Sequence, residues 1–239
     1  MLDLPIVKRI DFEEISYAEA WEQQTILHKQ LIQQKLDARK LTPPVDFHQN
    51  QHYFILCEHP HVYTLGKSGK PDHLLITDEF LAQIGATFYP INRGGDITYH
   101  GPGQIVGYPI LDLEDFVTDV HVYVRNLEQV MINVLAKYDL EGIRFKEYTG
   151  VWLAAGKGKP ARKICAIGVH LSRWVTLHGF AFNVNTNLDY FNYIVPCGIV
   201  DPEKSVTSLA QELGKELVMS EVKQQVATEF SNVFNCQII

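Results

Sequence analysis

The most distinctive stretch of the sequence is Arg93-Gly-Gly-Asp-Ile-Thr-Tyr-His-Gly-Pro-Gly-Gln104. Its four glycines and one proline within twelve residues exclude the interior of a helix or of an ordinary strand. Glycine lets the backbone approach another group closely, and the interleaved Arg, Thr, Tyr, His and Gln side chains can bind or orient polar groups. The stretch therefore predicts a loop that cradles a substrate, and the alternative is a polar surface turn.

This glycine-rich stretch is not a phosphate loop of the usual kinds. It lacks the pattern G-x-x-x-x-G-K-[ST], and it lacks G-x-G-x-x-G at the start of a helix. A nucleotide site at Arg93-Gly-Gly therefore has no support from these motifs.

The sequence on either side alternates between helical and strand-like patterns. Apolar residues recur with helical spacing over 17–36 and 120–138, and Asp119 is a suitable N-cap for the second of these helices. Three consecutive apolar runs with short breaks predict an antiparallel meander over 150–184. The order of elements predicts an α/β (α+β) fold with a mixed sheet flanked by helices. The further predicted elements are strands over 52–57, 86–91 and 104–111 and helices over 207–213 and 220–234.

Length and composition are those of an ordinary folded chain. The 239 residues are 46% hydrophobic and 21% charged, which excludes a disordered chain. A formal net charge of −7 argues against a general nucleic-acid binder. We expect a single domain over 1–239, with a small C-terminal lobe over 202–239 as the alternative.

Cysteine usage predicts a reducing compartment. The four cysteines form no C-x-x-C pair, and a chain of this size does not need disulfides. The N-terminus lacks the apolar core of a signal peptide, and no run of 18 apolar residues is present, so we expect a cytoplasmic protein without a membrane span. Cys57 and Cys165 lie within apolar runs and are expected in the core, whereas Cys236 lies in a tail expected to fray.

Two further residues can carry chemistry. Lys163 begins the apolar strand 164–169, and Cys197 lies in Val195-Pro-Cys-Gly-Ile199, where proline and glycine predict a tight turn. A thiol attacks as the thiolate, and a nearby ammonium group favours that form. The alternative is that Cys197 is an unreactive buried thiol. Cys57-Glu-His59-Pro-His61 has no second cluster with metal-ligand spacing, and no metal site is expected.

Basic residues gather in one region of this acidic chain. Glu147 is the one acidic residue between 143 and 174. Such a region favours an acidic protein partner, and the alternative is a solvated hairpin. Its basic members are Arg144, Lys146, Lys157, Lys159, Arg162, Lys163 and Arg173.

Taken together, these blocks resemble the octanoyltransferase, or lipoyl(octanoyl) transferase, family. The resemblance rests on the 93–104 stretch, Lys163-Ile-Cys-Ala-Ile-Gly168, His178-Gly-Phe-Ala-Phe-Asn-Val-Asn185, Pro196-Cys-Gly198 and Glu58-His-Pro-x-x-Tyr-Thr-Leu-Gly66. It implies the fold of the biotin/lipoate protein ligase catalytic domain, a mixed and largely antiparallel sheet flanked by helices. Asp96 departs from the pattern, since a neutral or longer side chain is expected there.

The resemblance also implies an activity, the first step of de novo protein lipoylation. An octanoyl group would pass from octanoyl-acyl carrier protein to a lysine on a lipoyl domain of a 2-oxoacid dehydrogenase complex or on the glycine cleavage H protein. Cys197 would carry the acyl thioester, and Lys163 would favour its thiolate and move protons. No cofactor, metal, nucleic acid or membrane is implied. The residues implied to line the acyl pocket are Arg93, Gly94, Gly95, Asp96, Ile97, Thr98, Tyr99, His100, Ala166, Ile167, Gly168, Gly179, Phe180 and Ala181.

Three other functions fit a fold of this kind. An ATP-dependent lipoate or biotin protein ligase needs an adenylate site and no nucleophilic cysteine. An enzyme that moves octanoyl groups between two lipoyl-carrier proteins would use the same lysine and cysteine. A non-catalytic acyl-binding protein would need neither Lys163 nor Cys197, and the presence of both argues against it.

Overall fold

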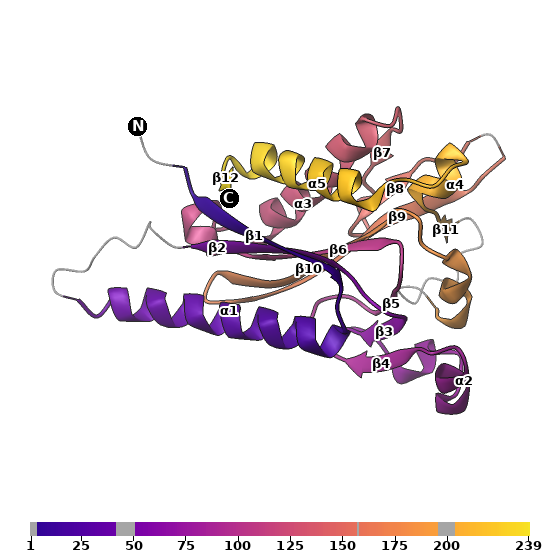
Figure 1. Ribbon diagram of the computed structural model, residues 1–239, viewed down its shortest axis with the longest axis horizontal. Helices are drawn as coiled ribbons and strands as arrows, with labels where there is room; N and C mark the ends of the chain where they lie inside the picture. Colours follow the sequence, from indigo (N-terminus) through magenta and orange to yellow (C-terminus); the bar gives the residue numbers. More distant parts are fainter. Residues whose placement is uncertain (1–3, 42–50, 157, 196–203) are drawn as a thin grey trace.

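Short apolar runs form the strands of a mixed sheet in the computed structural model, which describes residues 4–41, 51–156, 158–195 and 204–239 (Figure 1). Within these residues the sheet has nine strands in the order β12-β1-β2-β6-β10-β9-β8-β7, and β11 pairs with β9. The strands are β1 (Ile6–Glu14), β2 (His52–Glu58), β6 (Gln104–Ile110), β7 (Gly142–Ile143), β8 (Val151–Leu153), β9 (Ala161–Ser172), β10 (Val175–Asn183), β11 (Lys204–Val206) and β12 (Gln237–Ile238).

Most neighbours in this sheet are antiparallel. The pairs from β2 through β6, β10, β9 and β8 to β7 all run antiparallel. The three parallel pairs are β1 with β2, β1 with β12, and β11 with β9. The predicted meander and the predicted fold class are confirmed.

Helices cover both faces of the sheet. The long helix α1 (Tyr17–Ala38) crosses one face, and α3 (Val120–Ala136) and α5 (Met219–Phe234) lie on the other (Figure 1). Asp119 caps α3 as predicted, because its carboxylate accepts hydrogen bonds from the first backbone N–H groups of the helix. The shorter helices are α2 (Asp78–Gln83), α4 (Leu209–Leu213), and the 3-10 turns η1 (Pro71–His73), η2 (Leu113–Asp115) and η3 (Leu188–Tyr193).

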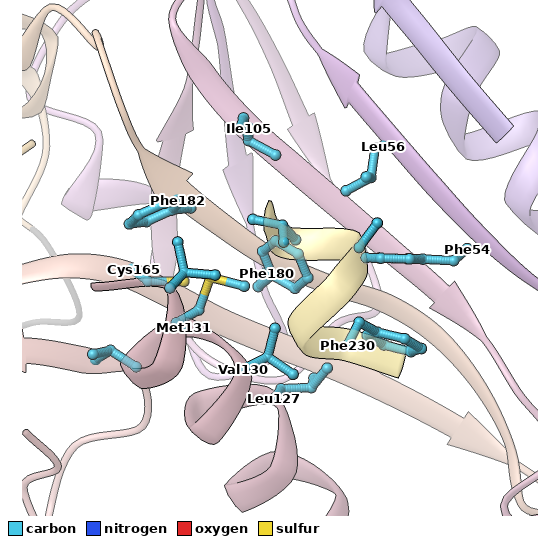
Figure 2. Packing of buried hydrophobic residues seen from close by; sticks show 14 of the residues in the cluster. Phe54, Leu56, Ile105, Leu127, Val130, Met131, Cys165, Phe180, Phe182 and Phe230 are labelled. Atoms are coloured by element: carbon cyan, nitrogen blue, oxygen red, sulfur yellow. The ribbon is translucent and has the colours of Figure 1, made fainter. Parts of the chain in front are cut away.

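The core between the sheet and helices α3 and α5 is aromatic and aliphatic. Phe54 of β2 stacks on Phe230 of α5 with ring centroids 4.3 Å apart, and Phe180 of β10 packs beside them (Figure 2). Cys165 is fully buried in the same cluster, as predicted. The C-terminal helix thus shares its core with the main sheet. The single-domain organisation stays a prediction, and this shared core supports it.

A second, three-stranded sheet contains part of the glycine-rich stretch. Its order is β4 (Thr87–Pro90), β3 (Val62–Leu65), β5 (Ile97–His100). The prediction that 93–104 contains no strand is wrong for residues 97–100, which pair antiparallel with β3. The glycines lie on either side of these four residues, so the turns that they permit bracket a strand instead of excluding one.

The end of the chain also differs from its prediction. The tail does not fray: β12 adds to the sheet beside β1, and the N–H of Arg9 donates to the carbonyl of Ile239 over 2.9 Å. Cys236 is consequently buried. Strands β1 and β12 are absent from the elements predicted above. Their backbone hydrogen bonds join strands far apart in the sequence, and such pairing leaves no local pattern of residue types. Over the described parts of the chain, no helix combines the length and apolarity needed to cross a membrane.

Candidate active site

The loop before β5 is held from two sides by backbone hydrogen bonds. The N–H groups of Gly66, Lys67 and Ser68 donate to carbonyls of Asp96, Arg93 and Gly95 over 3.0–3.2 Å. On the other side, the N–H of Gly94 donates to the Val169 carbonyl of β9 over 2.9 Å. A Cβ atom at Gly66 would collide with the Gly95 carbonyl, so glycine is needed for this approach. The loop is therefore a rigid bridge between β3 and β9.

A cavity of about 470 Å³ opens between this loop, β9 and β10. Lys163 lines it, together with nearly all residues that the sequence predicted for an acyl pocket. Those residues are Arg93, Gly94, Gly95, Asp96, Ile97, Thr98, His100, Ala166, Ile167, Gly168, Gly179, Phe180 and Ala181. The structure thus brings three separate sequence blocks to one cavity.

Tyr99 is the exception among the predicted pocket residues. Side chains alternate along a strand, so Tyr99 points away from the cavity that Thr98 and His100 line. Its hydroxyl lies 2.7 Å from Nδ1 of His61, and its ring stacks on Tyr190 with centroids 5.0 Å apart. Its contacts therefore anchor η3 to the small sheet.

Several buried polar side chains line the same cavity. They include Tyr17 and Tyr108, which lie on α1 and β6 and carry no motif in the sequence. Arg93 donates to both oxygens of Thr64, over 2.7 and 3.0 Å, and to the Gly94 carbonyl over 3.0 Å. The guanidinium group thus fixes the loop against β3 from within.

His100 is held as a neutral ring with a defined tautomer. Its Nδ1 lies 2.8 Å from Oε1 of Gln104, whose amide nitrogen donates to Oδ1 of Asn183 over 2.9 Å. The Gln104 oxygen must therefore accept, so the hydrogen-bond network assigns the proton to Nδ1 of His100 and leaves Nε2 as an acceptor. Burial, assisted by the neighbouring His59, lowers the pKa of His100 to about 3.

The hydrogen-bond chain continues from Asn183 toward Lys163. Asn183 donates to the carbonyl of Thr207 over 2.9 Å, and the N–H of Thr207 donates to the carbonyl of Lys163 over 2.9 Å. The Thr207 hydroxyl donates to Glu212 over 2.6 Å. This series of hydrogen bonds connects His100 to the backbone of Lys163, so one network positions both residues.

Glu212 was missed by sequence reasoning because no motif surrounds it. Its carboxylate binds Arg162 through two hydrogen bonds of 2.6 and 2.8 Å and lies 3.4 Å from Lys159. The bond with Arg162 is the main reason that the pKa of Glu212 falls to about 2. Arg144 also pairs with a carboxylate, since its Nε donates to the buried Glu128 over 3.0 Å. The predicted basic region is thus partly neutralised within the fold, which weakens the case for an acidic partner there.

Lys163 lies where two cavities meet. Its ammonium nitrogen is 4.8 Å from the centre of the Trp152 ring, a cation–π contact. A second cavity of about 620 Å³ adjoins the first, and Lys163, Ile194 and Lys204 line it. Cys197 lies outside the described residues. The chain on either side of its segment borders this second cavity, since Ile194 precedes the segment and Lys204 follows it.

Replacing Gly168 with alanine should displace the loop. The added Cβ would lie 2.8 Å from the Gly94 carbonyl and 3.1 Å from Cδ of Arg93, closer than packed atoms tolerate. A shift of about 1 Å in a substrate-positioning element can cost about 10²-fold, so we expect a loss of this order in kcat/KM for the reaction that takes place in this cavity. Gly156→Ala, with no atom within 4 Å of the added Cβ, is the matched control. Equal rates for the two variants would show that the close approach at Gly168 does not matter.

Comparisons with known proteins agree with this geometry. Residues 16–231 match the family described as "Lipoyl protein ligase A/B catalytic domain". The chain is 52% identical to an octanoyltransferase of Flavobacterium psychrophilum over 96% of its own length and 97% of that protein. It is 50% identical to an octanoyltransferase of Bacteroides thetaiotaomicron over 95% and 94% of the two chains.

Solved structures share the fold at much lower sequence identity. A bipartite lipoate protein ligase from Thermoplasma acidophilum, studied with its E2 lipoyl domain, superimposes with a TM-score of 0.69 at 13% identity over 99% of this chain and 86% of that one. A lipoate-protein ligase A bound with ATP gives a TM-score of 0.67 at 13% identity over 100% and 88% of the chains. These likenesses establish the biotin/lipoate ligase type of fold alone.

Proposed function

Because the chain belongs to the octanoyltransferases, within the lipoyl protein ligase A/B catalytic-domain family, and is therefore an acyltransferase, we propose that Cys197 carries the octanoyl group as a thioester. The donor is octanoyl-acyl carrier protein. The acceptor is a lysine on a lipoyl domain of a 2-oxoacid dehydrogenase complex or on the glycine cleavage H protein. The observation that carries this proposal is the convergence of the 93–100 stretch, Lys163 and the 166–168 and 179–181 segments on one cavity.

In the first half-reaction, the Cys197 thiolate attacks the carbonyl carbon of the donor thioester. A new S–C bond forms, the bond to the carrier's thiol breaks, and the departing thiolate takes a proton from the Lys163 ammonium. One thioester replaces another, so the step is nearly isoenergetic and needs no nucleotide. The Lys163 ammonium group lies over the Trp152 ring before the attack, and its positive charge favours the thiolate.

In the second half-reaction, the neutral Lys163 amine takes a proton from the incoming lysine ammonium of the lipoyl domain. The freed amine attacks the thioester, and the Cys197 thiolate leaves. One of the two protons on the attacking nitrogen passes to water, and the other stays as the N–H of the new amide. Lys163 is again an ammonium group beside a thiolate, so the cycle is closed. Backbone N–H groups near the cysteine are the proposed donors to the tetrahedral oxyanion.

The octanoyl chain is proposed to lie in the cavity of about 470 Å³. Val106, Phe180 and Ala181 supply apolar wall, and Gly168 and Gly179 bring backbone close to the chain. A Cβ atom at Gly179 would collide with the Gly107 carbonyl, so this wall cannot be thickened without moving β6.

The test is intact-protein mass spectrometry after brief incubation with octanoyl-acyl carrier protein and without ATP, followed by peptide mapping. We expect an octanoyl adduct on Cys197 that disappears when a lipoyl domain is added, with octanoyl-lysine appearing on that domain. No adduct in the absence of acceptor would overturn the covalent route. A parallel reaction with free octanoate and ATP tests ligation, the second candidate, which the shared fold with an ATP-bound ligase brings into consideration.

Replacing Lys163 with alanine should slow alkylation of Cys197 at neutral pH. Without the ammonium group, a smaller share of the thiol is ionised, and a rise of one unit in the thiol's pKa gives a rate about tenfold lower. The measurement is the rate of iodoacetamide labelling at Cys197 as a function of pH. Lys163→Arg, which keeps a positive charge, is the control and should lie near wild type. If both variants match wild type across the pH range, Lys163 has no part in forming the thiolate.

A further inference from the structure

We propose that His73 is a positioning residue that holds the chain segment before Cys197 against the 93–100 stretch. The inference rests on the proposed function, because its consequence is read at Cys197. His73 lies at the end of η1 and belongs to none of the blocks that carry the family resemblance. Its ring and its backbone carbonyl contact two different parts of the site.

The ring of His73 binds Asp96. Nδ1 of His73 lies 2.6 Å from Oδ2 of Asp96, whose side chain is only 9% exposed. The other carboxylate oxygen of Asp96 accepts a hydrogen bond of 2.6 Å from the N–H of Ile97, where β5 begins. A Cβ atom at Gly69 would lie 2.5 Å from the same oxygen, so the turn before η1 is packed closely around the carboxylate. Asp96 thus has a defined partner at the position where the sequence departs from the family pattern.

The backbone around His73 holds the residues that precede Cys197. The His73 carbonyl accepts a hydrogen bond of 2.9 Å from the N–H of Val195, and the N–H of Leu75 donates to the Tyr193 carbonyl over 2.9 Å. Between them, Leu74 forms an antiparallel bridge with Ile194. Residues 73–75 and 193–195 therefore form a short ladder.

The ladder ends two residues before Cys197 in the sequence. A displacement of Val195 is therefore expected to be passed along the chain to the nucleophile. Asp96 is part of the cavity wall. The contact between the His73 ring and Asp96 therefore fixes the position of Val195 relative to that wall. Loss of the ring contact should leave the ladder and the backbone hydrogen bonds of residues 66–68 to the loop intact, but remove the side-chain contact that sets η1 against Asp96.

The test compares His73→Ala with His73→Asn. The side-chain nitrogen of asparagine can take the place of Nδ1 and donate to Asp96, whereas alanine cannot. We expect His73→Ala to lower the rate constant for octanoyl transfer onto Cys197 about tenfold or more, with little change in the KM for the carrier protein, as expected for a misplaced nucleophile. His73→Asn should recover most of the rate. Asp96→Ala should match His73→Ala, and the double variant should lose no more than either single one.

The outcomes separate this inference from the proposed function. Wild-type protein that forms no adduct on Cys197 would refute the proposed function itself. Wild-type protein that forms the adduct, with His73→Ala at the same rate, would overturn the role of His73 alone. A slow His73→Asn variant, folded by circular dichroism and as slow as His73→Ala, would also overturn it, because the contact with Asp96 would then be irrelevant. His121→Ala, on an exposed position of α3, is the control for removal of an imidazole.

Discussion

Replacing Cys197 with serine should reduce octanoyl transfer at least about 10³-fold, the scale on which an activated nucleophile contributes. The hydroxyl of serine is far less acidic than a thiol, so a neighbouring ammonium group cannot generate its conjugate base near neutral pH. Any ester formed would also be a poorer acyl donor to an amine than a thioester. The measurement is the single-turnover rate of octanoyl transfer to a lipoyl domain.

The matched control is Cys236→Ser, the same substitution at a buried cysteine beside β12. It should keep the wild-type rate, with a modest loss of stability from placing a hydroxyl in an apolar site. Wild-type turnover by Cys197→Ser would eliminate the covalent route and would favour direct attack of the lysine on the donor. Equal losses in the two serine variants would point to unfolding as the cause.

Stability toward acid should be limited by three histidines that are buried in neutral form. Burial lowers the pKa of His59 to about 4 and the pKa values of His100 and His178 to about 3. In the unfolded chain a histidine titrates near 6.5, so the unfolded state binds more protons between about pH 6.5 and pH 3. The stability is therefore complete above pH 6.5 and falls as the pH is lowered through that window. From pH 7 to pH 5 each histidine should cost about 2 kcal/mol.

The measurement is urea unfolding at pH 7 and pH 5 for wild type and for His100→Asn. Asparagine can keep the hydrogen bond to Gln104 without a titrating ring, so the pH dependence of its unfolding free energy should be smaller by about 2 kcal/mol. His121→Asn, on the exposed side of α3, should behave as wild type. A His100→Asn protein with an unchanged pH dependence would show that His100 is not neutral in the folded state.

The sequence was sufficient where structure depends on local pattern. The periodicity of 120–138 predicted α3 to within two residues, and Asp119 was identified as its cap. The meander followed from three apolar runs separated by short breaks. The motif residues recognised by composition and resemblance line one cavity, and their roles there stay a prediction.

Long-range contacts were beyond reach of the sequence. Glu212 has no motif, and only the fold shows that it binds Arg162 and Thr207. Tyr17 and Tyr108 were hidden for the same reason, since aromatic residues in apolar patterns are typical of a core. His73 belongs to no motif in the sequence, and its significance depends on two partners far away in the sequence, Asp96 and Val195. Contacts of this kind depend on which residues the fold brings together, and the order of residues along the chain does not indicate them.

The pairing of β12 with β1 has a consequence for biosynthesis. β1 is synthesised long before its outer partner at residues 237–238, because nearly all of the described chain lies between the two strands. Until those residues are made, the outer edge of β1 presents unpaired N–H and C=O groups that another nascent chain can bind. Truncation or stalled translation before this point should therefore yield aggregation-prone chains even when the catalytic residues are all present.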